Sequence, residues 1–373
     1  MRTRVILITL ALGAFAQRHK MEEVDAQKPE GALLQQVMQE GDQTKKAALM
    51  EQFAQQFPKA EGTGWILEQL QAIYVKANDP DKVIATGEKL LALDPDDPES
   101  ALQNLKACET KKDLEGIRKW AGVTSANAGK MAAAPQPKDA DQAASWKQGM
   151  EYARDVGKYA DYALYRAAAE SRDPKATIAM VNALEKQSPK SEYMSQADAA
   201  LFMAYRQTGA NDQALAVAEK VLATDQSDED MLLVVADHDL QIKQEPEKVL
   251  AYSARIEQLM ASKPKPQGVS DADWTTRRNM VTGLAHYMSG KVYYGEGKFP
   301  QADQELRAAL PLVEANPPVK AETLYYLGFA NYKMEKPQEA ANYYRDCAAI
   351  KGPLQATAAK NLQGIKTQFH GIR

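Results

Sequence analysis

Hydrophobic positions near the C-terminal end of the chain follow a helical period. Residues 321–351 read AETLYYLGFANYKMEKPQEAANYYRDCAAIK, two amphipathic patterns separated by a short turn. Side chains spaced by three and four positions share one face of a helix. The small residues Gly328 and Ala340 on these faces allow two helices to approach closely. The positions on the two faces are Leu324, Leu327, Gly328, Ala340, Tyr344 and Cys347.

This arrangement resembles the tetratricopeptide repeat (TPR), a helix hairpin of about 34 residues that recurs along a chain. Asn331 occupies the position where the TPR pattern has Tyr, and Gly352-Pro353 replaces the final Pro. The resemblance extends over most of residues 30–351. It implies an all-α, right-handed superhelical solenoid of antiparallel helix hairpins, TPR-like, with a C-terminal capping helix over the last exposed apolar face.

The same patterns divide the chain into blocks of helix pairs. We predict an N-terminal TPR-like block over residues 30–120, a middle block over 144–262, a C-terminal block over 271–351 and a capping helix over 352–369. Residues 121–143 are rich in Ala, Gly, Ser, Pro and Asp. We interpret them as a linker between two blocks. A helix that extends through part of this segment is the alternative.

The N-terminal pattern is of another kind. Residues 1–16, MRTRVILITLALGAFA, place two arginines before an apolar run that ends in Ala14-Phe15-Ala16. This is typical of a secretory signal peptide, and the run is shorter than the roughly twenty residues that span a bilayer. An uncleaved anchor is the weaker alternative. Residues 17–29 are a polar, flexible lead-in. The sequence has no Asn-x-Ser/Thr acceptor, which favours a bacterial envelope, with the protein periplasmic or extracellular.

Composition and charge argue against nucleic-acid binding and against a disulfide. The chain of 373 residues has a formal charge of −4, and acidic and basic residues are well mixed. The sequence therefore shows no basic face of the kind that binds nucleic acid. Cys108 and Cys347 lie far apart within helical patterns, so we predict two small buried hydrophobic side chains and no disulfide between them.

Catalytic motifs are absent from the sequence, and we predict neither an enzyme nor a cofactor. The histidines are scattered outside any metal-ligand spacing, and His286 stands where a repeat holds a large packing residue. Gly295-Glu296-Gly297 lacks the preceding strand of a phosphate-binding loop and falls at a turn between helices. The histidines are His19, His238, His286 and His370.

In TPR families the first helices of successive hairpins line a concave groove that receives an extended peptide or a partner helix, and the resemblance implies the same here. Aromatic rings with interspersed cations have the composition of interface hot spots. The alternative is that some of these tyrosines pack between repeats. The residues that match groove positions are Tyr287, Lys291, Tyr294, Tyr325, Phe329, Tyr332, Lys333, Arg206 and Met203.

These observations predict a non-catalytic scaffold of the cell envelope that binds a protein or peptide partner in the concave groove. No membrane span is expected after the signal peptide is removed. A glycan- or small-ligand-binding module is the alternative, because tyrosine faces also stack on sugar rings. An enzyme with an unrecognised site is a third hypothesis. The oligomeric state is not predicted, and fold alone does not fix function.

Overall fold

The computed structural model describes residues 19, 26–370 and 372, and every regular element among them is an α-helix. The predicted signal peptide lies outside the described residues, as does most of the predicted lead-in. The chain divides into two compact units, Met1–Gly209 and Ala210–Arg373. The helices of unit 1 are α1 (Pro29–Gln39), α2 (Gln43–Gln56), α3 (Thr63–Lys76), α4 (Pro80–Leu93), α5 (Pro98–Lys111), α6 (Leu114–Ala132), α7 (Ala140–Glu170), α8 (Pro174–Gln187) and α9 (Met194–Thr208). Those of unit 2 are α10 (Asn211–Leu222), α11 (Glu229–Ile242), α12 (Pro246–Ser262), α13 (Asp271–Gly295), α14 (Phe299–Ala309), α15 (Pro317–Lys333), α16 (Pro337–Ala349) and α17 (Gln355–Gln368).

Short polar signals begin many of these helices. The side chains of Asp42, Asp97 and Asp228 accept hydrogen bonds from backbone amides in the first turns of α2, α5 and α11. Such a cap satisfies a donor that has no partner within the helix, and is worth about 0.5–2 kcal/mol. Proline follows the cap at the start of α4, α5 and α8, where its missing N–H costs nothing. These local signals explain why the hairpin turns are short.

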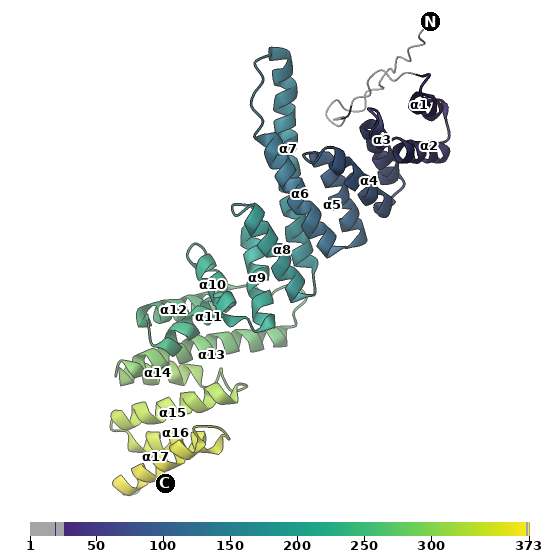
Figure 1. Ribbon diagram of the computed structural model, residues 1–373. Helices are drawn as coiled ribbons and strands as arrows, with labels where there is room; N and C mark the ends of the chain where they lie inside the picture. The colour runs from purple at the N-terminus through teal and green to yellow at the C-terminus, as the bar shows by residue number, and fades with distance from the viewer. Residues whose placement is uncertain (1–18, 20–25, 371, 373) are drawn as a thin grey trace. The chain divides into compact units, whose positions relative to one another are not determined.

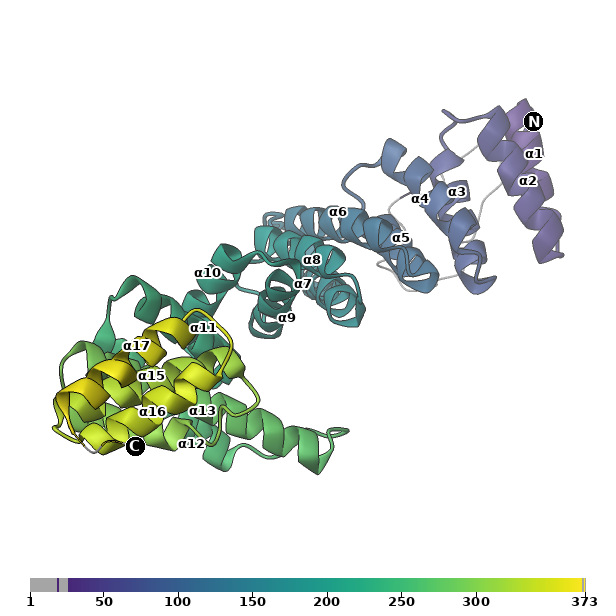
Figure 2. The same cartoon turned by 90° about the horizontal axis from the view of Figure 1, so that it is seen from below.

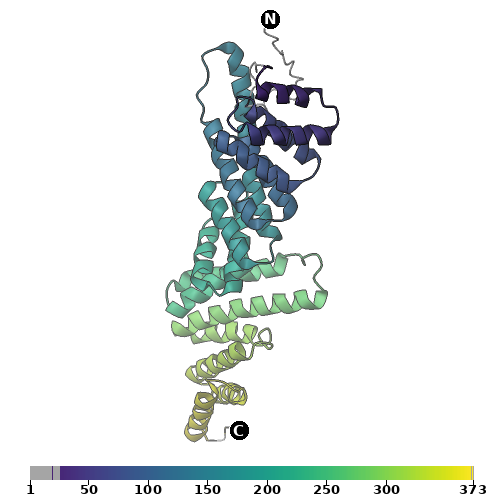
Figure 3. The ribbon, with the colours of Figure 1, turned by 45° about the vertical axis from the view of Figure 1, so that its right-hand side comes forward.

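Within each unit, every helix packs on the next one in the chain. Figure 1 and Figure 2 show this order from α1 to α9 in two directions, and Figure 3 shows the green and yellow helices of unit 2 following one another in the same way. Alternate helices also meet: α3, α5, α7 and α9 contact in succession in unit 1, and α11, α13 and α15 do so in unit 2. The first helices of successive hairpins thus form one layer, which is the TPR-like arrangement. The predicted all-α array of helix hairpins is confirmed.

The apolar cores follow the predicted periodicity. In unit 1, one core cluster gathers Leu34, Phe53, Ile66, Leu70 and Leu90 from the first four helices. In unit 2, another joins α15, α16 and α17, and the predicted final helix packs on α16. Each hairpin therefore buries its apolar faces against its neighbours, as repeat arrays do.

The predicted linker over residues 121–143 is wrong for most of its length. Helix α6 continues to Ala132, and α7 begins at Ala140. The cause is tertiary: Asn127 is 3% exposed, and its amide Nδ2 donates to the carbonyl oxygens of Pro95 and Asp97 at 2.9 and 3.1 Å. Alanine also favours helix more than any other residue. The helix extension was the better interpretation.

The two compact units do not coincide with the predicted blocks of helix pairs. The division between the units follows Gly209, inside the predicted middle block. Gly209 has φ +74°, a left-handed conformation that ends α9. Between the predicted middle and C-terminal blocks, at residues 262–271, α12 packs directly on α13 within unit 2. The proline-rich segment there is a loop inside a packed array.

Candidate functional site

The helices α13 and α15 carry seven of the nine predicted groove residues. On α13, Tyr287, Lys291 and Tyr294 are spaced by four and three positions and so lie along one face. On α15, Tyr325, Phe329, Tyr332 and Lys333 follow the same spacing. Because α13 and α15 contact each other in the layer of first helices, these two stripes face the same region.

Five rings from this region form what we call the aromatic surface: Tyr294, Phe299, Tyr325, Tyr326 and Phe329. The ring centroid of Tyr294 lies 4.7 Å from that of Tyr326 and 5.2 Å from that of Phe329. Phe299 lies 6.0 Å from Phe329, and Tyr325 lies 5.8 Å from Tyr326. All five side chains are partly exposed. The rings therefore support one another through tilted and edge contacts, which aromatic pairs favour, while part of each remains accessible.

Tyr287 is the exception among the predicted residues, because it is only 7% exposed. Its hydroxyl donates to Oε2 of Glu322 on α15 at 2.5 Å, and burial followed by this hydrogen bond raises the pKa of the Tyr287 hydroxyl. The Nζ of Lys291 lies 3.0 Å from the Tyr287 hydroxyl and 3.1 Å from the same carboxylate oxygen. Tyr287 and Glu322 thus hold Lys291 in place beside the aromatic surface.

Lys333 and Tyr332 lie at the other end of α15. Lys333 is exposed, and its Nζ lies 5.4 Å from the centre of the Phe329 ring, within cation–π range. The Tyr332 ring packs edge-on against Phe369 at 6.5 Å, and its hydroxyl donates to Gln368 at 3.0 Å. Tyr332 therefore connects α15 to the end of the final helix, whereas Lys333 provides an exposed cation.

The remaining two predicted residues, Met203 and Arg206, belong to α9 in unit 1. Met203 is 48% exposed and Arg206 is exposed. Both lie on a helix of the unit 1 layer, as the repeat spacing predicts. They are accessible, and they belong to a different compact unit from the aromatic surface.

Two members of the aromatic surface were not predicted. Burial is the main cause that raises the pKa of the Tyr326 hydroxyl to about 12. The Nζ of Lys291 lies 5.6 Å from the centre of the Tyr326 ring. Its position four residues after Glu322 places it on the same face, a signal that the sequence contains. Phe299 comes from the start of α14, and only the packing of α14 beside α15 brings it to this surface.

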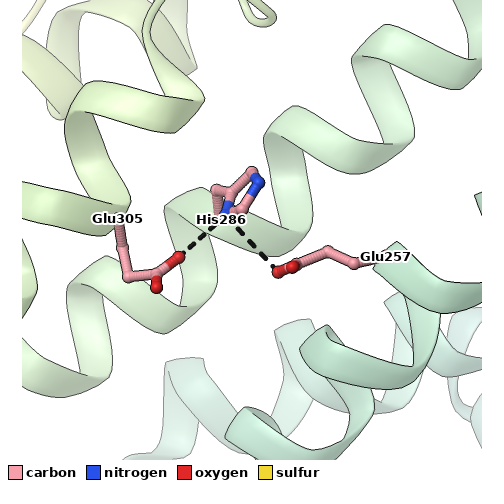
Figure 4. A group of neighbouring side chains, drawn as sticks. All are labelled: Glu257, His286 and Glu305. Carbon is pink, nitrogen blue, oxygen red and sulfur yellow. Dashed lines mark hydrogen bonds and ion pairs between the residues drawn. The ribbon is translucent and has the colours of Figure 1, made fainter. Parts of the chain in front are cut away.

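A second group of side chains, the acid–histidine cluster, joins Glu257 of α12, His286 of α13 and Glu305 of α14. The Nδ1 atom of His286 lies 2.7 Å from Oε2 of Glu305 and 3.4 Å from Oε1 of Glu257. Figure 4 shows the imidazole between the two carboxylates, which approach the same ring nitrogen. The hydrogen bond with Glu305 raises the pKa of His286 although burial opposes it, and burial raises the pKa of Glu257. The sequence alone predicted a packing role for His286.

Other sequence predictions about chemistry are settled by burial and turn geometry. Cys108 and Cys347 are both free and buried, as predicted, and burial raises the pKa of each thiol to about 11. Gly295 ends α13, and Gly297 has φ +73° in the turn before α14. This confirms a turn at Gly295-Glu296-Gly297.

Open hollows of about 590 and 630 Å³ lie in unit 1 and contain none of the nine predicted residues. The larger hollow is lined in part by Glu51, Tyr74 and Lys82, whose polar groups bond to one another. In the smaller one, Lys111 pairs with Asp81. Several polar groups that line these hollows are thus engaged within the protein, and none of the predicted groove residues lies there, so we place the candidate site on the aromatic surface.

No family model matches this chain, and no curated protein sequence matches it. Among solved structures, the crystal structure of the P58(IPK) TPR domain is 12% identical, with a TM-score of 0.30, and covers 92% of this chain and 98% of that one. The crystal structure of the yeast Tom70 is 11% identical, with a TM-score of 0.23, and covers 92% and 97%. Both TM-scores are low, and the TPR-like assignment rests on the serial packing of the helices.

A bilayer crossing requires length and hydrophobicity together, and no helix in the described part of the chain has both.

Proposed function

We propose that this chain is a non-catalytic interaction scaffold whose aromatic surface binds a protein or peptide partner. The observation that carries the proposal is a set of partly exposed rings on successive first helices, with the exposed Lys333 beside them. Tyrosine and phenylalanine rings provide a large contact area and lose little conformational entropy on binding. Such rings, together with cations, form the centres of protein interfaces.

The hydroxyl groups support this role. The hydroxyls of Tyr294, Tyr325 and Tyr326 have no hydrogen-bond partner among the described residues. The three rings themselves pack against other rings. Rigid rings with available hydroxyls suit a peptide, whose backbone offers donors and acceptors at regular intervals. Lys333 adds a cation for an acidic side chain of the partner. Lys291 is already paired with Glu322 and contributes position more than charge.

The test is capture of partners from envelope extract by the full chain, followed by crosslinking in intact cells. Tyr294→Ala, Tyr325→Ala and Phe329→Ala together should reduce recovery of the specific partners at least about tenfold, the scale expected for losing interface hot spots. The matched control is Tyr252→Ala, because Tyr252 is a partly exposed tyrosine of α12 with Lys248 5.8 Å from its ring centre. Circular dichroism must show that both variants keep wild-type helicity. Unchanged partners in the triple variant would refute the assignment of this surface.

Single substitutions refine the same test. Lys333→Ala should weaken binding less than the triple variant and make the remaining binding less sensitive to salt, because the exposed charge acts through screened attraction. Lys360→Ala is its control, since Lys360 is exposed on α17. Equal losses for Lys333→Ala and Lys360→Ala would show that general surface charge, and not the aromatic surface, attracts the partner.

Glycan binding is the outcome that would redirect the proposal. Retention of the chain on polysaccharide or peptidoglycan after protease treatment of the matrix would show that sugar rings, and not peptides, stack on the tyrosines. Loss of retention after the same treatment supports a protein partner. The triple variant must be run on both matrices so that either result is attributed to the aromatic surface.

We also propose that the protein is exported and works in the periplasm or outside the cell. The support is the pattern of residues 1–16, with two arginines, an apolar run and a small-x-small end. Fractionation of bacterial cells expressing the chain, followed by N-terminal sequencing, should find the protein outside the cytoplasm and beginning at Gln17. Recovery of the intact N-terminus in the cytoplasmic fraction would contradict the proposal.

A further inference from the structure

The acid–histidine cluster draws one side chain from each of three consecutive helices of unit 2. Glu257, His286 and Glu305 each offer one ligand atom, and these atoms all lie within 4.8 Å of one another. The side chains are 34%, 20% and 23% exposed, respectively. Three separate helices therefore place nitrogen and oxygen ligands at one partly shielded point (Figure 4).

The charges at this point are not balanced by the protein. Within the described part of the chain, neither Glu257 nor Glu305 forms an ion pair with a lysine or arginine. His286 is the only basic side chain there that pairs with either carboxylate. A protonated imidazole supplies one positive charge against two negative ones. Partly buried carboxylates without enough positive charge are costly, so the site favours an additional cation.

The hydrogen-bond geometry has the same consequence. Both carboxylates approach the single atom Nδ1 of His286, at 2.7 Å and 3.4 Å. A ring N–H can donate well along only one direction, so it satisfies Glu305 better than Glu257. A metal ion in place of that proton would accept the lone pair of Nδ1 and one oxygen from each carboxylate at the same time.

We propose that Glu257, His286 and Glu305 bind a divalent first-row transition-metal ion, for which Zn²⁺ is the reference. Imidazole with carboxylates suits Zn²⁺, Co²⁺ and Mn²⁺, whereas Mg²⁺ and Ca²⁺ prefer oxygen ligands alone. Ligand atoms of a tetrahedral Zn²⁺ site are about 3.3 Å apart, given bonds of about 2.0–2.1 Å. The His286–Glu257 separation of 3.4 Å already matches, and the His286–Glu305 separation of 2.7 Å must widen slightly. Water fills the remaining position.

The bound ion links successive hairpins. It connects α12, the second helix of one hairpin, to α13 and α14 of the next. Because it binds the folded arrangement of the three helices and not the unfolded chain, it stabilises this part of the array. The proposal does not depend on a partner at the aromatic surface, and either can fail without the other.

The experiment uses the untagged full chain after removal of metals with a chelator. Calorimetric titration with Zn²⁺ should show a single site that involves the cluster, and Co²⁺ should produce visible absorption bands that indicate its ligand geometry. Loss of an outer-shell partner already weakens metal sites about 10- to 100-fold. Glu257→Gln, Glu305→Gln and His286→Ala should therefore each lower the Zn²⁺ affinity at least about tenfold. An excess of Mg²⁺ should leave the Zn²⁺ affinity unchanged.

Matched controls and folding checks make the result decisive. His238→Ala removes another partly exposed histidine of unit 2, and Glu247→Gln removes an exposed glutamate of α12. Both should bind Zn²⁺ as the wild type does. If His286→Ala fails to fold by circular dichroism, the two isosteric glutamine variants provide the test. Absence of Zn²⁺ binding to the wild type, or equal binding in folded cluster variants, would overturn the proposal, and effective competition by Mg²⁺ would do so as well.

Discussion

Tyrosines make two kinds of contact in this protein, and one group from each unit illustrates them. In unit 1, several donate their hydroxyls to glutamates on other helices and so hold helices together. In unit 2, the tyrosines of the aromatic surface contact other rings, and among the described residues their hydroxyls have no hydrogen-bond partner. The hydroxyl-bonded pairs of unit 1 are Tyr74–Glu51, Tyr152–Glu99 and Tyr159–Glu109. The comparison shows that a tyrosine at a helical spacing indicates a contact, but the spacing does not say whether the ring or the hydroxyl makes that contact.

The largest stability effect is expected where two helices approach beneath the aromatic surface. A Cβ at Gly328 would lie 2.9 Å from atoms of the Tyr344 ring, which is packed against Tyr325 at a centroid distance of 5.7 Å. Gly328→Ala should therefore lower the free energy of unfolding by about 1–3 kcal/mol, the usual cost of overpacking. Urea denaturation of the full chain measures this change.

Gly364 provides the matched control for Gly328. It also lies within a helix, α17, but no atom lies within 4 Å of a Cβ built there. Gly364→Ala should raise the free energy of unfolding by about 0.5–1 kcal/mol, because alanine is the better helix former. If Gly328→Ala also raises the free energy of unfolding, the ring above Gly328 must move aside, and the aromatic surface is less rigid than described.

A somewhat smaller effect is expected at Asn331. This side chain is 0% exposed, and its Nδ2 donates to Asp303 of α14 at 2.6 Å and to the carbonyl oxygen of Leu327 at 2.9 Å. Asn331→Leu removes a donor from a largely buried carboxylate, and should cost about 1–2 kcal/mol in unfolding free energy. Asn342→Leu, at an exposed position of α16, should stay within about 0.5 kcal/mol. Arg307 also pairs with Asp303, with its Nε 2.8 Å from Oδ2. Equal costs would show that Arg307 alone satisfies Asp303.

Local pattern was sufficient to predict the hairpins and some of their packing. Gly328 was expected to permit a close helix approach, and the Tyr344 ring packs against it. Asn331, which departs from the TPR pattern, uses its amide to join α14 and α15, so the departure has a structural cause. Of the seven predicted residues on α13 and α15, Tyr294, Tyr325 and Phe329 join one group of ring contacts, because helical spacing and serial packing together determine their positions.

Contacts between distant residues could not be predicted from the sequence. The helical state of residues 121–132 depends on Asn127 bonding to carbonyls of the preceding turn between helices. The acid–histidine cluster requires three helices to converge, and no local spacing relates Glu257, His286 and Glu305. Burial separates Tyr287 from Tyr294, although both occupy the same stripe of α13. Each of these depends on how neighbouring helices pack, and the pattern within one helix does not contain that information.

Removing single hydroxyls tests the comparison between the units directly. The Tyr159 hydroxyl donates to Oε2 of Glu109 at 2.6 Å, and the Glu109 side chain is only 7% exposed. Tyr159→Phe should lower the unfolding free energy by about 1–1.5 kcal/mol, because a carboxylate loses a charge-assisted hydrogen bond. Tyr294→Phe should change it by less than about 0.5 kcal/mol. Similar costs for the two variants would contradict the distinction between hydroxyl-bonded and ring-packed tyrosines.

The smallest expected effect is a pH dependence of the Tyr74–Glu51 pair in unit 1. The hydrogen bond from Tyr74 is the main cause that lowers the pKa of Glu51; burial opposes it, and Lys82 adds to it. Because the folded-state pKa is below the unfolded one, this contribution to stability is complete above the unfolded pKa of about 4.3 and is lost as pH falls through the folded pKa. The effect is small because the Glu51 side chain is 47% exposed.

The stability difference between the wild type and Tyr74→Phe, from urea midpoints at a series of pH values, should therefore shrink below about pH 4. The difference between the wild type and Tyr294→Phe should stay constant over the same range, because no carboxylate accepts a hydrogen bond from that hydroxyl among the described residues. A Tyr74→Phe difference that is equally constant would show that Lys82, and not the tyrosine, determines the ionisation of Glu51.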